Sequence, residues 1–314
     1  MKKVILITST YNGADDLPAL LDSIFAQTYQ NIDLYVRDDG SGDSTVNILR
    51  EYQSCAPEGK RIILVNDSTN DWGNKGAHQS YHCLIHALPK ADYYIFCDQD
   101  DVWMPDKVER AVSHMERYPD TVPVLYTHNY YVCDGDLNPE HTLLDKETIS
   151  SEAMPSVNLA KVIMTGTWGG VGMAQAFNHT LKELAFHTGD FDHSIAIDCW
   201  ISWVVAGMNG ALIYDKKPLA YYRRHTGTYS SGGAGGLLRY KDWSRHMDRH
   251  CSNITNGIRD YNRLYGKQVS EDRAAFLALF DSSNRLGKFC YPHRLRTNLL
   301  DEIAFRILIL LGKI

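Results

Sequence analysis

Residues 93–101 read YYIFCDQDD, an apolar run followed at once by three carboxylates in four positions. Five apolar residues suit a buried strand, whereas like charges packed this closely repel one another. Such a cluster persists where a cation or a donor-rich ligand compensates the charge. Oxygen ligands suit Mg²⁺ or Mn²⁺, and Mg²⁺ sites use one or two carboxylates plus substrate phosphates. An acidic surface turn or helix cap explains the run equally well when it is taken alone.

The residues that lead up to this stretch alternate between strand and helix patterns. Apolar runs and helical periodicities follow one another at residues 4–7, 17–25, 33–37, 46–52, 62–65 and 77–87. Because the strands are apolar throughout, they fit a parallel sheet covered by helices on both faces. Polar or acidic residues follow the first, second and fourth strands, and open α/β sheets bind ligands beyond the carboxyl ends of their strands. The sequence therefore predicts an α/β fold with a ligand site at that edge.

The pattern beyond residue 101 is less regular. We expect a strand at 124–127, a long loop at 137–155, a Gly-rich strand under the substrate at 168–176, a helix at 198–205 and short strands at 211–214 and 219–222. A Gly/Ser stretch at 230–236 marks a domain boundary, and Ser270 can cap a later helix. We therefore predict a catalytic domain at residues 1–232 and a helical region at residues 237–314.

Charge is spread unevenly along the 314 residues. The net charge of −6 argues against nucleic-acid binding. From Leu238 onward there are 14 basic and 8 acidic residues, or +6, which leaves −12 for the rest. A basic C-terminal part suits anionic lipid or a diphosphate-linked acceptor, and solvated helix faces are the alternative.

The last residues, 303–314, are strongly apolar, with Arg306 and Lys313 interspersed. They fit either an amphipathic membrane-interface anchor or a packed homodimer interface. No apolar run approaches the ~20 residues that span a bilayer. The seven cysteines show no CxxC spacing, which favours reduced thiols. We expect a cytoplasmic protein, peripheral on the inner face of the cell membrane.

Three further groups of polar residues are candidates for chemistry. Asp38 and Asp39 precede a Gly-Ser-Gly turn and can accept hydrogen bonds from a base or ribose, or simply form an Asp-Gly turn. Asp198 opens a helix, where it is either a general base or a cap. Residues 222–225, Tyr-Arg-Arg-His, can grip a diphosphate and complete a metal site, or form an exposed basic turn.

Together these motifs resemble glycosyltransferase family 2 over roughly residues 1–230. The matching segments are Thr8 to Asn12, Ser23 to Tyr29, Arg37 to Ser41, Asn74 to Gly76, Cys97 to Pro105, Asp198 to Trp200 and Tyr222 to His225. The resemblance implies the GT-A fold, a Rossmann-like, mostly parallel sheet flanked by helices. Two departures, Cys199 beside the base and the Gly-rich run at 168–172, concern the acceptor side.

The resemblance also implies a role for each matching residue. Asp198 is the expected catalytic base, and Asp100 and His225 are the expected metal ligands. The expected donor-binding residues are Thr8, Tyr11, Asp38, Asp39, Gly76, Asp98, Arg223 and Arg224. Among these, Tyr11 is expected to stack near the nucleobase, Asp39 to bond the base and Asp98 to bond the ribose.

The wording DQDDVW at residues 98–103 is similar to a rhamnosyltransferase-like branch of the family. This implies an inverting transferase that uses Mn²⁺ or Mg²⁺ and a nucleotide-sugar donor, either dTDP-rhamnose or a UDP-hexose. The implied acceptor is a carbohydrate or lipid-linked glycan of bacterial surface polysaccharide. A sugar-phosphate nucleotidyltransferase and a non-catalytic sugar-binding protein are the alternatives.

Overall fold

The computed structural model describes most of the chain. The described residues are 1–65, 76–143, 159–165, 171–187, 195–224, 237–296 and 299–314, with backbone alone at 161, 165 and 237–250. The strands are β1 Val4–Thr10, β2 Ile32–Asp38, β3 Lys60–Leu64, β4 Tyr93–Phe96, β5 Val102–Trp103, β6 Val124–Cys133, β7 Pro139–Thr142, β8 Gln175–Asn178 and β9 Ala211–Arg223. The helices that accompany the sheet are α1 Leu17–Phe25, α2 Thr45–Ser54, α3 Ala77–Ala87, α4 Lys107–Met115, α6 Leu159–Thr165, the 3₁₀ turn η1 Gly172–Ala174, α7 His179–Phe186 and α8 Ile197–Gly207. The later helices are α9 Leu237–Tyr265, α10 Glu271–Asp281, α11 Arg285–Phe289 and α12 Leu299–Leu310.

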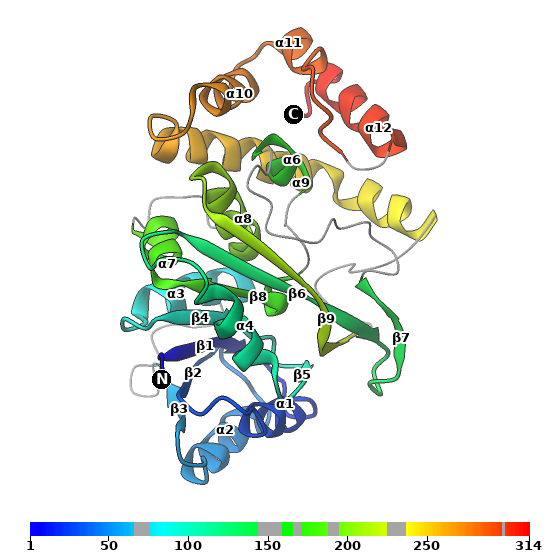
Figure 1. The fold of residues 1–314 in the computed structure, drawn as a ribbon. Helices are drawn as coiled ribbons and strands as arrows, with labels where there is room; N and C mark the ends of the chain where they lie inside the picture. The colour runs from blue at the N-terminus through cyan, green and yellow to red at the C-terminus, as the bar shows by residue number, and fades with distance from the viewer. Residues whose placement is uncertain (66–75, 144–158, 166–170, 188–194, 225–236, 297–298) are drawn as a thin grey trace.

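The strands form one nine-stranded sheet within the described residues. Its order is β3-β2-β1-β4-β8-β6-β9-β5, with β7 paired to β6. The first four strands of this order run parallel, β8 is antiparallel to both β4 and β6, and β6 and β9 run parallel to each other. Helices cover the sheet (Figure 1). This confirms the predicted α/β fold with a mostly parallel sheet.

The first hundred residues fold as their periodicity predicts. One face of α1 is fully buried, as its helical spacing predicts. This face consists of Leu17, Leu20, Leu21 and Ile24. Pro18 stands in the first turn of α1, where its missing N–H costs no hydrogen bond. Helix α3 has the predicted bounds. The local pattern is decisive here because each element is short and regular.

Three expectations for the middle of the chain were wrong. Residues 211–214 and 219–222 belong to one strand, β9, whose pairing with β6 shifts register at His128 and Asn129. The expected loop at 137–155 contains β7 within its described part. The expected strand at 168–176 starts only at Gln175, because η1 precedes it, and its first residues lie outside the described part. Irregular pairing of this kind is set by the partner strand and leaves no period in the sequence.

The C-terminal helices share a hydrophobic core with α8. The Trp200 ring lies 5.9 Å from that of Tyr261 and 6.0 Å from that of Tyr265, both on α9. Gly257 of α9 packs so closely on Trp203 that a Cβ would come within 2.4 Å of its ring. The predicted boundary at 230–236 lies outside the described residues, and the division into two domains stays a prediction. Ser270 stands at the N-cap of α10 as expected, but its side chain makes no capping hydrogen bond.

Helix α12 has two apolar faces. Phe305, Leu308 and Ile309 are buried against the neighbouring helices. The opposite face exposes a set of large aliphatic side chains, Leu299, Leu300, Ile303, Ile307 and Leu310, and Leu311 is exposed just after the helix. Figure 1 places α12 and α11 at the end of the molecule remote from α1 and α2. Among the described residues, we find no helix with the length and apolar character needed to cross a membrane.

Candidate active site

The carboxyl ends of three neighbouring strands meet at one edge of the sheet. In the parallel register Thr10 of β1 pairs with Asp38 of β2, and Ile7 of β1 pairs with Phe96 of β4. The loops that follow these strands therefore emerge side by side, as the pattern of polar clusters predicted. Tyr11 lies in the loop after β1 and Asp39 in the loop after β2. We call residues 98–101, in the loop after β4, the acidic loop.

Asp38 and Asp39 make different contacts. The Asp38 carboxylate accepts hydrogen bonds from Thr10 Oγ1 at 2.9 Å and from the Ser41 backbone N–H and Oγ at 2.8 and 2.6 Å, so it organises the turn after β2. Asp39 is 2% exposed and pairs with the buried Arg37 guanidinium. Its Oδ2 accepts from the backbone N–H of Gly76 at 2.8 Å. Asp39 thus fixes the entry to α3 at the ligand edge.

The carboxylates of the acidic loop are partly or fully removed from solvent. Burial and the neighbouring charge of Asp100 raise the pKa of Asp98 to about 7, although a hydrogen bond from Tyr81 at 3.0 Å acts in the opposite direction. Burial and the charges of Asp98 and Asp100 also raise the pKa of Asp101, which is fully buried. A cation placed near Asp98 and Asp100 would relieve this repulsion.

Lys107 lies beneath the acidic loop and is 1% exposed. Its ammonium donates to the carbonyl of Met173 at 2.7 Å and sits 3.6 Å from the centre of the Trp103 ring. Burial lowers its pKa to about 7, while the charges of Asp101 and Asp98 act in the opposite direction. Lys107 therefore joins α4 to η1 directly under the loop that carries the carboxylates.

Asp198 stands in the first turn of α8. Its Oδ1 accepts from the backbone N–H of Cys199 at 2.9 Å, and its side chain packs on Gly172, where a Cβ would lie 3.5 Å from the Asp198 Cβ. Burial raises the pKa of Asp198, and the charge of Asp198 in turn raises that of Asp98. The fold therefore brings the predicted base within electrostatic range of the acidic loop from an element 100 residues later.

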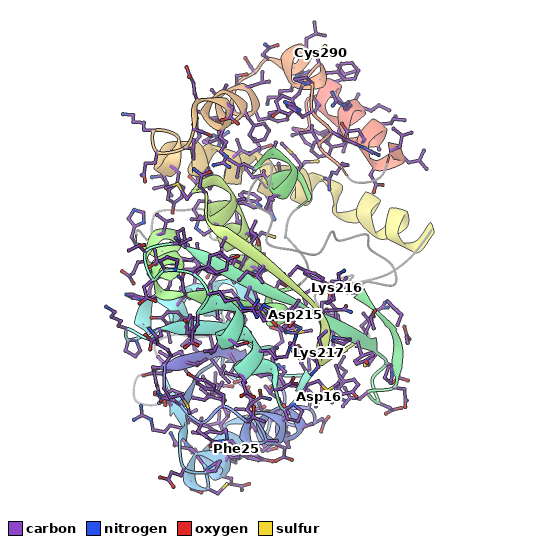
Figure 2. All side chains as sticks on the ribbon, viewed as in Figure 1. Asp16, Phe25, Asp215, Lys216, Lys217 and Cys290 are labelled. Carbon is purple, nitrogen blue, oxygen red and sulfur yellow. The ribbon has the colours of Figure 1, made fainter. Side chains whose placement is uncertain are left out.

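The two arginines at the end of β9 make local contacts. Arg223 donates from Nε to the Asp100 carbonyl at 2.9 Å and pairs with Asp16, which precedes α1, at 3.0 Å. Its backbone N–H donates to Asp101 Oδ1 at 3.3 Å. Arg224 lies 4.0 Å from Glu140 of β7. Figure 2 labels Asp16 together with residues 215–217 of β9. Arg223 thus holds the acidic loop between α1 and β9.

The remaining predicted residues occupy different positions. Tyr11 is 48% exposed at the edge, whereas Thr8 is fully buried within β1. Gly76, with φ +80°, starts α3. His225 and residues 168–170 lie outside the described part of the chain. The donor, metal and base roles of these residues stay predictions.

Sequence reasoning missed Gln99 and Lys107. Gln99 bonds both backbone groups of Tyr11, 88 positions earlier in the chain. No periodicity indicates that contact, since it depends on the register of β1 and β4. A polar residue between two aspartates and a lysine in an apolar helix face were the only available signals.

A divalent cation fits the acidic loop by the chemistry of its donors. Asp98 and Asp100 are half-buried carboxylates, and burial together with the charge of Asp100 raises the pKa of Asp98. A bound cation would favour the charged form of both carboxylates. Within the described residues no group of three metal-binding side chains is assembled. Mg²⁺ commonly binds one or two carboxylates and takes its other ligands from phosphates and water, so two carboxylates suffice for such a site.

The α/β sheet, with acidic and polar loops at its parallel edge and Asp198 within electrostatic range from a later helix, has the architecture of the GT-A class of glycosyltransferases. The sequence model of glycosyl transferase family 2 matches residues 5–181, which is more than half of the chain. The chain belongs to this family and is a glycosyltransferase. Membership favours glycosyl transfer over the nucleotidyltransferase alternative.

Several relatives are named as glycosyltransferases. The putative glycosyltransferase EpsE of Bacillus subtilis is 34% identical over 74% of this chain and 79% of its own length. The dTDP-rhamnosyl transferase RfbG of Shigella flexneri is 38% identical over 33% of this chain and 35% of its own. The UDP-Glc:alpha-D-GlcNAc-diphosphoundecaprenol beta-1,3-glucosyltransferase WfaP of Escherichia coli is 31% identical over 42% of this chain and 47% of its own. The last two thus match over less than half of their own length.

Solved structures agree on the fold. TarS residues 1–349 of S. aureus superimposes with a TM-score of 0.57 at 13% identity, over 99% of this chain and 80% of that one. The same protein in complex with UDP-GlcNAc gives a TM-score of 0.53 at 12% identity, over 98% and 89%. At this identity the likeness establishes the GT-A fold alone.

Proposed function

We propose that this protein transfers a sugar, with inversion, from a nucleoside diphosphate sugar to a carbohydrate or lipid-linked acceptor of bacterial surface polysaccharide. The observation that carries the proposal is the meeting of Tyr11, Asp39 and the acidic loop at one sheet edge, with Asp198 in electrostatic range of Asp98. These groups match the parts of a nucleoside diphosphate. An aromatic ring and hydrogen-bond acceptors suit the nucleoside, and acidic groups can hold a cation against the phosphates.

The proposed donor is dTDP-rhamnose or a UDP-hexose. RfbG is named for the first nucleotide and WfaP for the second. Thymine and uracil present the same hydrogen-bonding edge, so one set of loops serves either base.

The proposed cofactor is Mn²⁺ or Mg²⁺, with Asp100 and His225 as protein ligands. When bound, such a cation neutralises negative charge on the diphosphate leaving group. Asp98 would bond the donor ribose, and Arg223 holds the carbonyl of Asp100 so that the carboxylate keeps its place.

Asp198 is the proposed general base. In this step a carboxylate oxygen of Asp198 takes the proton of the acceptor hydroxyl, and the hydroxyl oxygen forms a bond to the anomeric carbon. The bond between that carbon and the diphosphate oxygen breaks on the opposite face, which inverts the configuration. Burial, which raises the pKa of Asp198, strengthens it as a base. Its Oδ1 is held by the Cys199 N–H, so the carboxylate keeps one orientation.

A thermal-shift panel tests the donor site. UDP, dTDP, GDP and CDP are each added with and without Mn²⁺ to the wild type, to Asp100→Ala and to the control Glu58→Ala on the exposed turn before β3. A ligand at 100-fold its dissociation constant stabilises a protein by about 2.7 kcal/mol. We expect a Mn²⁺-dependent shift with UDP or dTDP that Asp100→Ala loses and Glu58→Ala keeps. The absence of a shift with every nucleotide would contradict the proposal.

The proposed working place is the inner face of the cell membrane, contacted through residues 303–314. The exposed residues of α12 fall within an arc of about 120° when each residue turns the helix by about 100°. No charged side chain lies within that arc. Residues 282–314 hold six basic and two acidic residues, a net charge of +4, and Arg294 is exposed just before α12. An apolar stripe beside basic groups is complementary to an anionic lipid surface.

Vesicle sedimentation tests this contact. We expect the protein to pellet with vesicles that contain phosphatidylglycerol and less with pure phosphatidylcholine. The double variant Ile303→Gln, Ile307→Gln should lose binding, whereas Arg294→Gln should lower only the preference for anionic lipid. A second copy of the chain would be the occupant of the stripe instead if the double variant left vesicle binding unchanged but turned a dimer into a monomer in sedimentation velocity.

A further inference from the structure

Four consecutive backbone N–H groups in the loop after β1 donate to side chains of other segments. We call residues 11–14 the nucleoside loop. The pairs are Tyr11 with Gln99 Oε1 at 2.9 Å, Asn12 with Ser41 Oγ at 2.9 Å, Gly13 with Thr45 Oγ1 at 2.9 Å and Ala14 with Asp43 Oδ2 at 3.1 Å. Ser41 and Asp43 come from the loop after β2, Thr45 is the first residue of α2, and Gln99 comes from the acidic loop. These side-chain acceptors therefore hold the backbone of the nucleoside loop in place, without the regular backbone hydrogen bonds of a helix or strand.

Gln99 makes a two-point contact with Tyr11. Its Oε1 accepts from the Tyr11 backbone N–H at 2.9 Å, and its Nε2 donates to the Tyr11 carbonyl at 3.1 Å. An amide is the neutral side chain that supplies one donor and one acceptor in this spacing. Gln99 thereby pairs with Tyr11 as a neighbouring strand would, beyond the point where β1 and β4 stop pairing.

The surrounding backbone is shaped to receive the Gln99 side chain. Asn12 adopts a positive φ of +46°, which an asparagine tolerates better than most residues. A Cβ on Gly13 would lie 2.5 Å from Gln99 Oε1, so the position next to the amide accepts no side chain without rearrangement. The contact therefore depends on the Gln99 amide and on the small residue at position 13.

We propose that Gln99 is a positioning residue that holds the nucleoside loop at a fixed spacing from the acidic loop. This rests on the proposed function, in which Tyr11 contacts the nucleobase and Asp98 and Asp100 serve the ribose and phosphate end. A nucleoside diphosphate binds both ends at once, so it depends on the spacing between the two loops. Pyrophosphate with Mn²⁺ uses the acidic loop alone and does not depend on that spacing. Gln99 itself contacts neither the sugar nor the acceptor.

The test compares two probes on the full chain. Calorimetry measures Mn²⁺-dependent binding of UDP or dTDP, whichever the wild type binds, and of pyrophosphate with Mn²⁺. Gln99→Met keeps the length of the side chain and removes the amide without adding a charge. The matched control is Gln53→Ala, which removes a glutamine amide bonded to the Ile62 carbonyl at 2.8 Å, away from the site.

We expect Gln99→Met to weaken nucleotide binding about tenfold, the effect of losing two hydrogen bonds of ordinary strength. Binding of pyrophosphate should stay within about twofold of the wild type, because pyrophosphate does not depend on the spacing between the two loops and so couples only weakly to Gln99. In turnover the donor KM should rise while kcat at saturating donor is kept. Gln53→Ala should change none of these.

Two results would overturn the inference. Nucleotide binding by Gln99→Met equal to that of the wild type would show that the spacing is held without Gln99. An equal loss for nucleotide and pyrophosphate would place Gln99 in direct support of the phosphate end instead. Failure of the wild type to bind any nucleotide would count against the proposed function, which keeps the two failures apart.

Discussion

Asp215 is a buried carboxylate, whereas the acidic loop holds one buried and two half-buried carboxylates, and the two places have different surroundings. Asp215 Oδ2 accepts from Arg110 Nε at 2.9 Å and from the Tyr126 hydroxyl at 2.9 Å, and its Oδ1 accepts from the Lys217 backbone N–H at 3.0 Å. Figure 2 shows Asp215 on β9. One carboxylate there meets a guanidinium and two further donors. The acidic loop instead holds three carboxylates above one buried ammonium, that of Lys107.

The difference separates a structural ion pair from a ligand site. Around Asp215 the charges balance inside the fold, so the group needs nothing from outside. In the acidic loop, burial and then the charges of the neighbouring carboxylates raise the pKa of Asp98 and of Asp101. Perturbed carboxylates in a loop at a ligand edge are typical of functional sites. The predictions below test this contrast.

The largest expected effect is on catalysis at Asp198. We expect Asp198→Asn to bind donor nucleotide as the wild type does and to lose transfer by about 10²–10⁴-fold, the usual contribution of a general base. The measurement is turnover beside nucleotide binding by calorimetry. Near-normal turnover would exclude Asp198 as the base.

The second prediction sets Asp100 against Asp215. Asp100→Asn removes one of several repelling charges, so the free energy of unfolding should stay the same or increase while Mn²⁺-dependent nucleotide binding is lost. Denaturant unfolding with and without UDP or dTDP and Mn²⁺ measures both. Nucleotide binding that persists in Asp100→Asn would remove the distinction between the two groups.

The third prediction is the converse for Asp215. Asp215→Ala leaves the buried Tyr126 hydroxyl and the half-buried Arg110 without their carboxylate. We expect a loss of about 2 kcal/mol in unfolding free energy, the range for buried polar groups that lose a partner. Nucleotide binding measured by calorimetry below the melting range should not change. Equal stability of variant and wild type would mean that the pair contributes nothing net.

The smallest expected effect is a shift in a pH profile. Burial raises the pKa of Asp198, so more of this base is protonated at a given acidic pH than for an exposed aspartate. The acid limb of kcat, measured at saturating donor and metal, should therefore lie above the ordinary aspartate pKa of about 3.9. An acid limb at or below that value would place the base in a more polar setting than the one seen here.

The sequence predicted local elements better than long-range contacts. Residues 4–7 and 77–87 were placed well because their periodicity is local and regular. The two short strands expected at 211–214 and 219–222 are one strand, because Lys216, Lys217 and Pro218 interrupt the apolar pattern without ending the strand. For the site, the motifs identified the right edge of the sheet, but Gln99 and Lys107 act on partners 88 and 66 positions away. Such contacts follow from strand register and helix packing, which a local pattern does not contain.

Because Gly13 packs on Gln99, the residues that are tolerated at one of these positions depend on the residue at the other. A methyl group at 13 would collide with the Gln99 amide, whereas a smaller residue at 99 leaves room for it. Gly13→Ala should therefore be harmful in the native background and much less so once Gln99 is replaced by alanine, a non-additive pair of the kind seen between residues in contact. A lineage can change the two positions in one order more easily than in the other. A variant library that changes either position should therefore change both together.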